Sequence, residues 1–505
     1  MRHVWFPIVV VGLAGAWWAW RLAATGYVTI FHLLVALLAA VLVSVWFTRC
    51  GPGARRVRLG IVWAMWLALV AWMIAFKPVY NGDMGIWRWQ SRFGAKADQK
   101  LDALEARGEA IDWQSTEHDY PRFLGTGYWP EVTGVELETD WRSHPPEEVW
   151  RREVGAGWSS FAVVGNYAVT QEQRGNQEIV SCYRVDTGEP VWTHADDTRF
   201  DPADFQGGLG GIGPRATPTI VGDRIYTQGG TGIVNCLDAR TGRVIWRHDT
   251  AKETGADVLV WGKSGSPLVV DDLVIVNVGA PNDVAQRAAF NSSLVAYDRK
   301  TGELRWAAGN RQASYSSPML ATIAGQPQVL VLNESYLTSH RPSDGAVLWE
   351  TPWSDEFDTN ATTTQPIPLS DDRIFLSKGY GVGSSLLEVE RDTSGKMTPV
   401  PVWEPAIKRV MKTKFNNPVV RDGYVYGLDD VLLECLELET GRVKWKKRRD
   451  PKFGHGQLLG VGDLRLVQAE YGELVLVEPT PEEYRELDSI QVLDPVERAW
   501  NTPAF

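Results

Sequence analysis

Five basic side chains lie shortly before segments that could open β-strands. Each such opening is a small polar or amide residue, in most cases followed by proline and an apolar run. The basic residues are Arg215, Lys263, Arg311, Lys414 and His455. If the openings meet in the folded protein, these cations converge and could bind an anion. The alternative is that each base pairs with a local carboxylate or reaches a backbone carbonyl, because repeats copy structural residues as readily as binding ones.

The openings belong to a repeat of about fifty residues, marked by a glycine followed four residues later by a tryptophan. The pairs are Gly188/Trp192, Gly242/Trp246, Gly302/Trp306, Gly345/Trp349 and Gly441/Trp445, with a stretched version at Gly395/Trp403. Residues 236–246, 296–306 and 435–445 also share an acidic residue and Thr-Gly before the tryptophan. We therefore expect the tryptophan of each unit to pack on the neighbouring unit.

Each repeat predicts four short antiparallel strands. The first strand follows the opening proline. A turn rich in Asp and Gly, such as Gly222-Asp223, joins the first two strands, because both residue types suit tight hairpins. The Thr-Gly turn joins the third strand to the fourth. Four strands per unit, with an aromatic contact between units, are typical of a β-propeller.

The repeated pattern Ala-x-Asp-x-x-Thr-Gly-x-x-x-Trp, over roughly residues 112–505, resembles the pyrroloquinoline quinone (PQQ) repeat family, which includes quinoprotein alcohol dehydrogenases and BamB-like proteins. The resemblance implies an all-β propeller of the eight-bladed type and is strongest to BamB-like, membrane-anchored members. It also implies that PQQ, a carboxylated quinone, is the anion to consider for the basic residues. Many of the dehydrogenases hold the quinone against a disulfide of adjacent cysteines, and this chain has no Cys-Cys pair. We expect no cofactor, with PQQ as the alternative.

The ends of the propeller sequence predict seven full blades and an incomplete eighth. The segment around Trp150 resembles a fourth strand, yet no complete unit precedes it, and residues 501–505 resemble a unit opening. A closing blade would then combine strands from both ends, with two strands missing. We expect the chain to be truncated relative to its relatives.

Three apolar stretches, residues 4–20, 27–47 and 59–76, contain no Asp, Glu, Lys or Arg, and each is about long enough to cross a bilayer as a helix. A cleavable signal peptide is the alternative for the first. Four arginines between residues 49 and 58 favour a cytoplasmic position for that loop. We therefore expect a multi-pass protein of the bacterial inner (cytoplasmic) membrane, with a cytoplasmic N-terminus and a periplasmic propeller.

The expected organisation is a membrane anchor at residues 1–80, a juxtamembrane stalk at 81–111 and a propeller at 112–505. The net charge of -11 averages a basic anchor without Asp or Glu and an acidic remainder. An acidic propeller argues against nucleic-acid binding, because Lys and Arg supply most of that affinity.

Residues that could catalyse a reaction are few. The chain has no Gly-x-Ser-x-Gly, no His-Glu-x-x-His and no calcium loop of alternating acidic residues. We therefore assign no catalytic residue and no metal ligand. Cys182, Cys236 and Cys435 occupy equivalent third-strand positions, so we expect them to be buried and unpaired.

Two functions remain after these exclusions. The first is a non-catalytic scaffold that is anchored in the membrane and binds protein or envelope partners. The alternative is a PQQ-dependent oxidoreductase that holds its anionic cofactor at the mouth of the central channel, and a tethered sensor is a third possibility. A calcium site of Glu, Asn and Asp beneath the cations would favour the enzyme.

Overall fold

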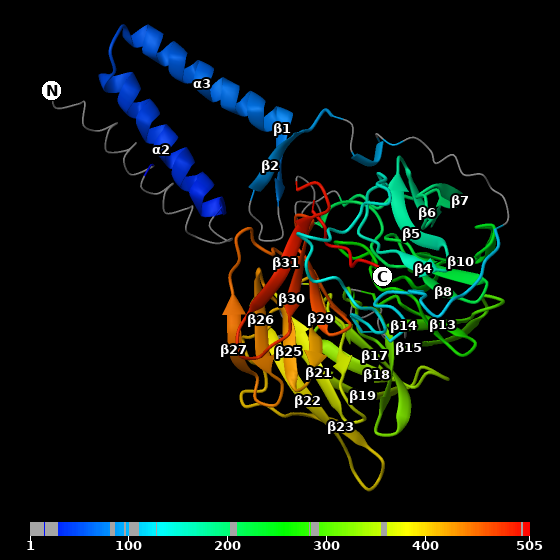
Figure 1. The fold of residues 1–505 in the computed structure, drawn as a ribbon. Helices are drawn as coiled ribbons and strands as arrows, with labels where there is room; N and C mark the ends of the chain where they lie inside the picture. The colour runs from blue at the N-terminus through cyan, green and yellow to red at the C-terminus, as the bar shows by residue number, and fades with distance from the viewer. Residues whose placement is uncertain are drawn as a thin grey trace. The chain divides into compact units, whose positions relative to one another are not determined.

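The computed structural model of the protein describes residues 15, 29–80, 86–94, 97–99, 101, 111–127, 129–202, 210–281, 283, 292–354, 361–495 and 498–505. These residues belong to two compact units, 1–96 and 97–505 (Figure 1). The span expected at residues 4–20 lies outside the described residues, except for Gly15.

The described residues of the first unit include two apolar helices, α2 (Thr29–Cys50) and α3 (Arg55–Ala75). They cover the second and third expected spans, with shifted boundaries. Because α3 begins at Arg55, most of the arginines expected in a loop lie in its first turns. Helix α3 is long and apolar enough to cross a bilayer and has no buried residue, whereas the apolar segment Val35–Cys50 of α2 is shorter. Among the described residues, one helix therefore meets the length and composition of a span, where the sequence predicted three.

A two-stranded antiparallel sheet of β1 (Phe76–Tyr80) and β2 (Ile86–Ser91) follows α3 directly. The expectation of a helix to residue 76 and then a solvated stalk did not include this hairpin. Pro78 disfavours continuation of the helix. The hairpin sequence is also rich in aromatic and β-branched residues, which favour strands.

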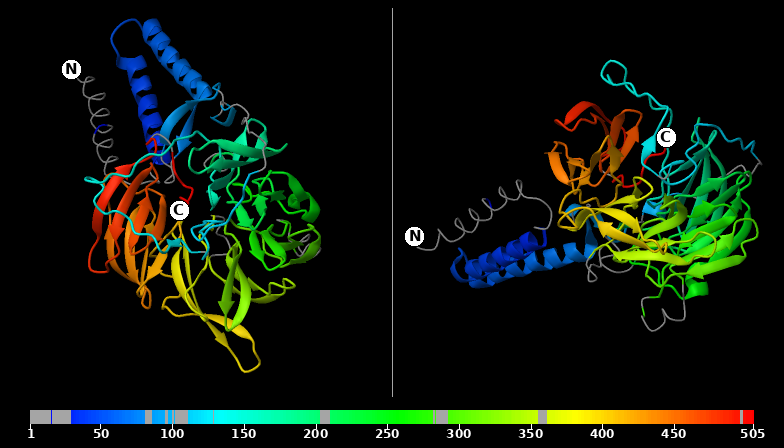
Figure 2. Two further views of the ribbon diagram at one scale, coloured as in Figure 1. Left: turned by 45° about the vertical axis from the view of Figure 1, so that its right-hand side comes forward. Right: turned by 90° about the horizontal axis from the view of Figure 1, so that it is seen from below.

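In the second unit the described residues form seven sheets, each built from four consecutive antiparallel strands, and the sheets are arranged around a common axis (Figure 2). We number them as blades. Blade 1 comprises β4 (Ala162–Val164), β5 (Tyr167–Arg174), β6 (Gln177–Arg184) and β7 (Pro190–Asp196). Blade 2 comprises β8 (Thr219–Val221), β9 (Arg224–Gln228), β10 (Ile233–Asp238) and β11 (Val244–Asp249), followed by the short helix α5 (Thr250–Thr254). Blade 3 comprises β12 (Leu268–Val270), β13 (Leu273–Asn277), β14 (Leu294–Asp298) and β15 (Leu304–Ala308).

The remaining four blades repeat the same order of strands. Blade 4 comprises β16 (Met319–Ile323), β17 (Gln326–Asn333), β18 (Tyr336–His340) and β19 (Val347–Pro352). Blade 5 comprises β20 (Ile367–Pro368), β21 (Arg373–Lys378), β22 (Gly383–Arg391) and β23 (Met397–Pro401). Blade 6 comprises β24 (Val419–Arg421), β25 (Tyr424–Asp429), β26 (Leu432–Glu437) and β27 (Arg442–Lys447). Blade 7 comprises β28 (Gln457–Val461), β29 (Leu464–Gln468), β30 (Glu473–Glu478) and β31 (Arg485–Gln491), with β3 (Glu131–Val132) added in parallel to β28.

Tryptophan–glycine contacts join neighbouring blades, which confirms the expected packing. A Cβ added to Gly242 would lie 2.4 Å from the Trp192 ring, and the Trp192 indole N–H donates to the Ala239 carbonyl at 3.0 Å. The other contacts of this kind are Trp150 on Gly188, Trp246 on Gly302, Trp306 on Gly345 and Trp403 on Gly441. Gly395, in the stretched repeat, does not contact a tryptophan, and Trp349 instead donates to Gln328 within its own blade.

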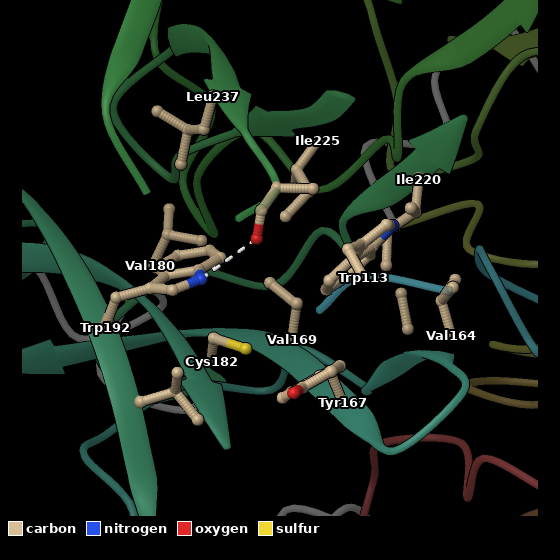
Figure 3. Packing of buried hydrophobic residues seen from close by; sticks show 13 residues of the cluster. Trp113, Val164, Tyr167, Val169, Val180, Cys182, Trp192, Ile220, Ile225 and Leu237 are labelled. Carbon is tan, nitrogen blue, oxygen red and sulfur yellow. Dashed lines mark hydrogen bonds between the residues drawn. The ribbon is translucent and has the colours of Figure 1, made fainter. Parts of the chain in front are cut away.

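Apolar cores lie between the blades. Figure 3 shows the core between blades 1 and 2, where Trp192 covers Cys182, Ile225 and Leu237, and Trp113 joins from the N-terminal side of the propeller. Cys182, Cys236 and Cys435 are buried and free, as the sequence predicted.

Residues 111–127 and 129–132 run along the side of the propeller where the first and second strands turn. The Trp113 indole donates to the Gly222 carbonyl at 3.0 Å, and the Ile220 amide donates to the Pro121 carbonyl at 2.8 Å. Residues Arg122–Leu124 line a channel cavity of about 20 Å³ together with the beginnings of several first strands. That volume is about the room needed for one water molecule. Residues Arg122–Leu124 therefore narrow the channel on the side of the propeller where the first and second strands turn.

Blades 7 and 1 meet without a further four-stranded sheet among the described residues. Trp150 covers Gly188 and donates to the Val185 carbonyl at 2.6 Å, which is the contact made by fourth-strand tryptophans elsewhere. From the other end of the chain, the Thr502 hydroxyl donates to Gln457 Oε1 at 3.1 Å. The two ends of the propeller sequence are therefore held against blades, Trp150 against blade 1 and Thr502 against blade 7.

Candidate functional site

One position in each repeat surrounds the mouth of the channel. It is the residue three before the opening proline, or before Phe161 and Leu458 where proline is absent. All of these residues except His455 are partly exposed, and nearly all of the residues that follow them are buried. We call this set the mouth ring, and it comprises Trp158, Arg215, Ser264, Tyr315, Thr363, Phe415, His455 and Trp500.

Three aromatic members of the mouth ring form a continuous arc. The Trp500 ring lies 4.7 Å from that of Trp158 and 4.7 Å from that of Phe415, measured between centroids. The Arg498 guanidinium lies 4.4 Å from the Trp500 centroid and 5.7 Å from that of Trp158. The indole N–H groups are fixed as well: Trp158 donates to the Gly210 carbonyl and Trp500 donates to Glu470. The arc therefore presents ring faces with a cation stacked on them.

The other arc of the mouth ring, which begins at Arg215 next to Trp158, is more polar. Tyr315 accepts a hydrogen bond from the Trp261 amide at 3.3 Å, and the two rings lie 5.5 Å apart. Arg215 donates to the carbonyls of Gly210, Gly211 and Gly213 and lies 5.1 Å from the Phe200 ring centroid. Burial lowers the pKa of Arg215 to about 10. Among the described residues, its charge has no directly bonded carboxylate.

A belt of hydrogen bonds below the mouth ring sets the spacing of the blades. It uses the polar residue immediately before each proline. The Thr217 amide donates to Ser266 Oγ at 2.9 Å, and the Ser266 amide donates to Ser317 Oγ at 2.9 Å. The Ser317 amide then donates to Gln365 Oε1 at 3.0 Å, and the Gln365 amide to Asn417 Oδ1 at 2.7 Å. The opening strands of blades 2 to 6 are thus fixed to one another, and this fixes the mouth-ring residues that lie two positions before the belt residues.

The structure brings together two of the five basic residues that the sequence singled out. Lys414 Nζ lies 3.2 Å from His455 Nε2, and it also lies 5.3 Å from the Tyr380 ring centroid and 3.9 Å from Asp430. Both side chains are buried. Arg215 belongs to the other arc of the mouth ring.

Lys263 and Arg311 have local partners instead. Lys263 is buried and donates to the carbonyls of Asp257 and Val278 at 2.7 and 2.5 Å, and burial lowers its pKa to about 8. Arg311 bonds Glu350 at 2.6 Å and lies 3.4 Å from the Tyr336 ring centroid. Contacts to a local carboxylate and to backbone carbonyls are what we expect if these two basic residues serve the structure and do not bind a ligand. Binding of an anion by the full set of five stays a prediction.

The sequence analysis did not identify the aromatic members of the mouth ring, because it followed charged residues and not the position of each residue relative to the opening proline. Lys263 and Lys414 stand four residues before their prolines and Arg311 stands seven before, so they do not share one face of the repeat. Alignment of the units on the proline would have placed Trp500 and Tyr315 at the position of Arg215.

The geometry of the mouth ring supports binding. Stacked rings beside guanidinium groups suit an aromatic or apolar group that carries negative charge. Among the described residues there is no group of three or more His, Cys, Asp and Glu side chains that could hold a metal ion.

Seven four-stranded antiparallel blades, joined by tryptophan–glycine contacts around a channel, define a β-propeller of the PQQ-repeat class. The chain belongs to the family described as outer membrane protein assembly factor BamB, whose model matches residues 175–447, more than half of the sequence.

Individual relatives are distant. The chain is 28% identical over 285 residues to an outer membrane protein assembly factor BamB of Burkholderia pseudomallei, covering 48% of this chain and 68% of that protein. It is 24% identical over 249 residues to a polyvinylalcohol dehydrogenase of a Pseudomonas species, covering 45% of this chain and 33% of the dehydrogenase. It thus spans only about a third of the latter's length. The structure of BamB from Moraxella catarrhalis matches with a TM-score of 0.44 and 15% identity, over 66% of this chain and 88% of that one.

Proposed function

We propose that the protein is a membrane-anchored scaffold whose propeller docks a protein partner at the mouth ring. The observation that carries this proposal is the arc of Phe415, Trp500 and Trp158 with Arg498 stacked upon it. Partly exposed aromatic and Arg side chains at one site are typical of the energetic centres of protein interfaces. The family to which the chain belongs is described by an assembly factor, and assembly requires the binding of other proteins.

The partner segment should carry aromatic or apolar side chains together with carboxylates. Trp158, Trp500 and Phe415 offer ring faces, and Arg498 and Arg215 supply positive charge on the two arcs. The propeller is acidic as a whole, so this local positive charge distinguishes the mouth from the rest of the surface.

The anchoring and the closure of the ring belong to the same proposal. Helix α3 and the apolar stretches before it hold the chain in the bacterial inner membrane, with a cytoplasmic N-terminus and the propeller in the periplasm. The propeller is of the eight-bladed type, with the segments around Trp150 and Thr502 as the two strands of an incomplete eighth blade.

Site-specific photo-crosslinking in membranes tests the scaffold. A photoreactive phenylalanine analogue at Trp158 is expected to give a discrete heavier adduct, and addition of Trp500→Ala should weaken it several-fold. The same analogue at Lys300, an exposed residue in the turn between β14 and β15, is the control and should give none. Equal adducts at both positions, or none at position 158, would overturn docking at the mouth ring.

The second candidate is a PQQ-dependent oxidoreductase, which the match to the polyvinylalcohol dehydrogenase favours. A tricyclic quinone does not fit the channel cavity of about 20 Å³, because small-molecule sites are typically several hundred Å³. In this alternative, Arg215 and the Trp500 ring would therefore hold it at the mouth. There the quinone would supply the redox chemistry, and these residues would bind and orient its carboxylates. Titration of the detergent-solubilised protein with PQQ and Ca²⁺, followed by a dye-linked alcohol oxidation assay, decides: turnover that Arg215→Gln abolishes would favour the enzyme.

A further inference from the structure

The β1–β2 hairpin is fastened to the end of α3 without a linker. The Phe76 amide donates to the Trp72 carbonyl, and the Arg92 amide donates to the Ala75 carbonyl at 2.8 Å. The Arg92 side chain also donates to the Phe76 carbonyl at 3.3 Å. Both ends of the hairpin are therefore held at the last turn of the helix (Figure 1).

Aromatic rings gather at this junction and remain exposed. The Trp72 ring lies 4.2 Å from that of Phe76 and 6.2 Å from that of Trp89. Trp72 is 46% exposed, Trp89 41% and Phe93 79%. Such exposure of several large aromatic side chains is unfavourable in water, but it is the usual arrangement where a membrane-spanning segment meets the headgroup layer.

Positive charge accompanies the rings. Lys77 and Arg92 are exposed, and neither forms an ion pair with another described residue. Arg88 adds a third positive charge to the hairpin sequence, in register with Val79. Basic residues next to a membrane attract anionic lipids.

We propose that this hairpin lies in the interfacial layer of the membrane and binds anionic phospholipid headgroups through Lys77 and Arg92. The inference rests on the proposed anchoring by α3. A helix of 21 residues is about 32 Å long, close to the thickness of the hydrocarbon core. The residue that follows it must then lie at the boundary, so a lipid surface, and not a soluble protein, covers Trp72 and Trp89.

A fluorophore at position 93 tests the location. The protein carries Cys50→Ser and Phe93→Cys, the latter labelled with an environment-sensitive dye, and is placed in phosphatidylcholine nanodiscs. Cys182, Cys236 and Cys435 do not interfere, because they are buried. The emission is expected to be blue-shifted and quenched by lipid spin-labelled near the headgroup. The same dye at Lys300→Cys, exposed on the propeller, should show neither effect.

The preference for anionic lipid is measured by comparing spin-labelled phosphatidylglycerol with spin-labelled phosphatidylcholine in the same nanodiscs. Phosphatidylglycerol should quench more strongly at equal mole fraction. Lys77→Gln and Arg92→Gln should each lower the preference about five-fold, and high salt should remove it. Equal quenching by both lipids in the unsubstituted protein overturns the lipid specificity. A blue shift without quenching means that protein covers the rings and overturns the proposal as a whole.

A separate labelling experiment tests whether α3 spans the bilayer. In proteoliposomes, an impermeant thiol reagent should reach Cys50 and a cysteine at position 93 from opposite sides. Labelling of both from the same side shows that α3 does not span the bilayer and removes the proposed topology. Labelling from opposite sides with a water-exposed fluorophore at position 93 removes only the interfacial hairpin.

Discussion

Trp158 and Trp500, which lie at the two ends of the propeller sequence, pack against one another with ring centroids 4.7 Å apart and ring planes tilted by 33°. This contact connects the segment before blade 1 to the segment after blade 7. It also forms the centre of the aromatic arc, so the same two side chains hold the ring of blades together and present its candidate binding surface.

Trp500→Ala is therefore expected to destabilise the propeller by about 2–4 kcal/mol. The substitution removes two aromatic contacts, each worth about 1 kcal/mol, and the hydrogen bond from the indole to the Glu470 carboxylate. Urea unfolding of the detergent-solubilised protein, followed by tryptophan fluorescence, measures the change. Val149→Ala, at a side chain that is 77% exposed, is the control and should shift stability by less than about 0.5 kcal/mol. A loss of the same small size for Trp500→Ala would contradict the role in closure.

The two glycines of blade 2 separate backbone strain from packing. Gly222 and Gly242 have φ values of +60° and +69°, but a Cβ added to Gly222 would meet no atom within 4 Å, whereas one added to Gly242 would meet a tryptophan ring. Gly222→Ala should cost about 1–2 kcal/mol, which is the left-handed backbone alone. Gly242→Ala should cost about 2 kcal/mol more, because its Cβ would lie 2.4 Å from the Trp192 ring. Equal losses in urea unfolding would show that Trp192 moves aside freely.

Glu178 makes stability depend on pH. It is buried and accepts a hydrogen bond from the Gly230 amide at 3.0 Å, and burial raises its pKa to about 7. Because the folded state holds this proton more tightly than the unfolded chain, stability should fall as pH rises from about 4.5 to 7 and then level off, by about 3 kcal/mol in total. Glu178→Gln removes the titrating group. The stability of the variant relative to the unsubstituted protein should therefore rise across that interval.

The control for this pH series is Glu172→Gln. Glu172 is buried too, but it accepts from Arg174 at 3.0 Å and from the hydroxyl groups of Ser181 and Tyr183 at 2.5 Å. Its substitution should destabilise the protein, because the buried Arg174 loses this carboxylate. If the stability of Glu178→Gln relative to the unsubstituted protein stays flat from pH 4.5 to 8, Glu178 does not hold a proton in the folded state.

Burial should decide how much the ion pairs of two arginines, Arg449 and Arg341, contribute to the free energy of unfolding. Arg449 is enclosed in blade 7 and bonds Glu473 at 2.6 Å and Glu486 at 2.8 Å. Arg449→Gln should cost about 3–5 kcal/mol, because two carboxylates are left without their cation. Arg341, half exposed beside Asp344 at 2.7 Å, is the control, and Arg341→Gln should cost less than about 0.5 kcal/mol. Comparable urea midpoints for the two variants would contradict the argument from burial.

Much of the propeller could be predicted from the repeat, because a hairpin turn and a tryptophan contact are local signals that recur at a fixed offset. Asp271 and Asp422 occupy their turns with positive φ, as that chemistry requires. The pairing of β3 with β28 could not be predicted, since it joins segments more than 300 residues apart and involves two residues on each strand. Nor did charge alone locate the mouth ring. Lys263 is basic but faces carbonyls inside its own blade, whereas the neutral Phe415 reaches the mouth.

In the membrane region the sequence indicated which stretches are apolar, but it did not indicate where the helices end. Composition identified the apolar stretches, but it did not show that the helix ends at Ala75 and continues into a strand at Phe76. Phe76 itself is apolar and fits either state, so the boundary depends on Pro78 and on the cross-strand partner at Trp89.

The belt of hydrogen bonds ties the opening strands of blades 2 to 6 to one another, whereas among the described residues side-chain contacts take the place of a four-stranded sheet where blades 7 and 1 meet. This junction is a seam in the described part of the ring, and Trp158 and Trp500 lie across it. A partner that binds these two side chains would hold the two ends of the propeller sequence together. The melting temperature of the whole propeller should therefore rise with the concentration of that partner.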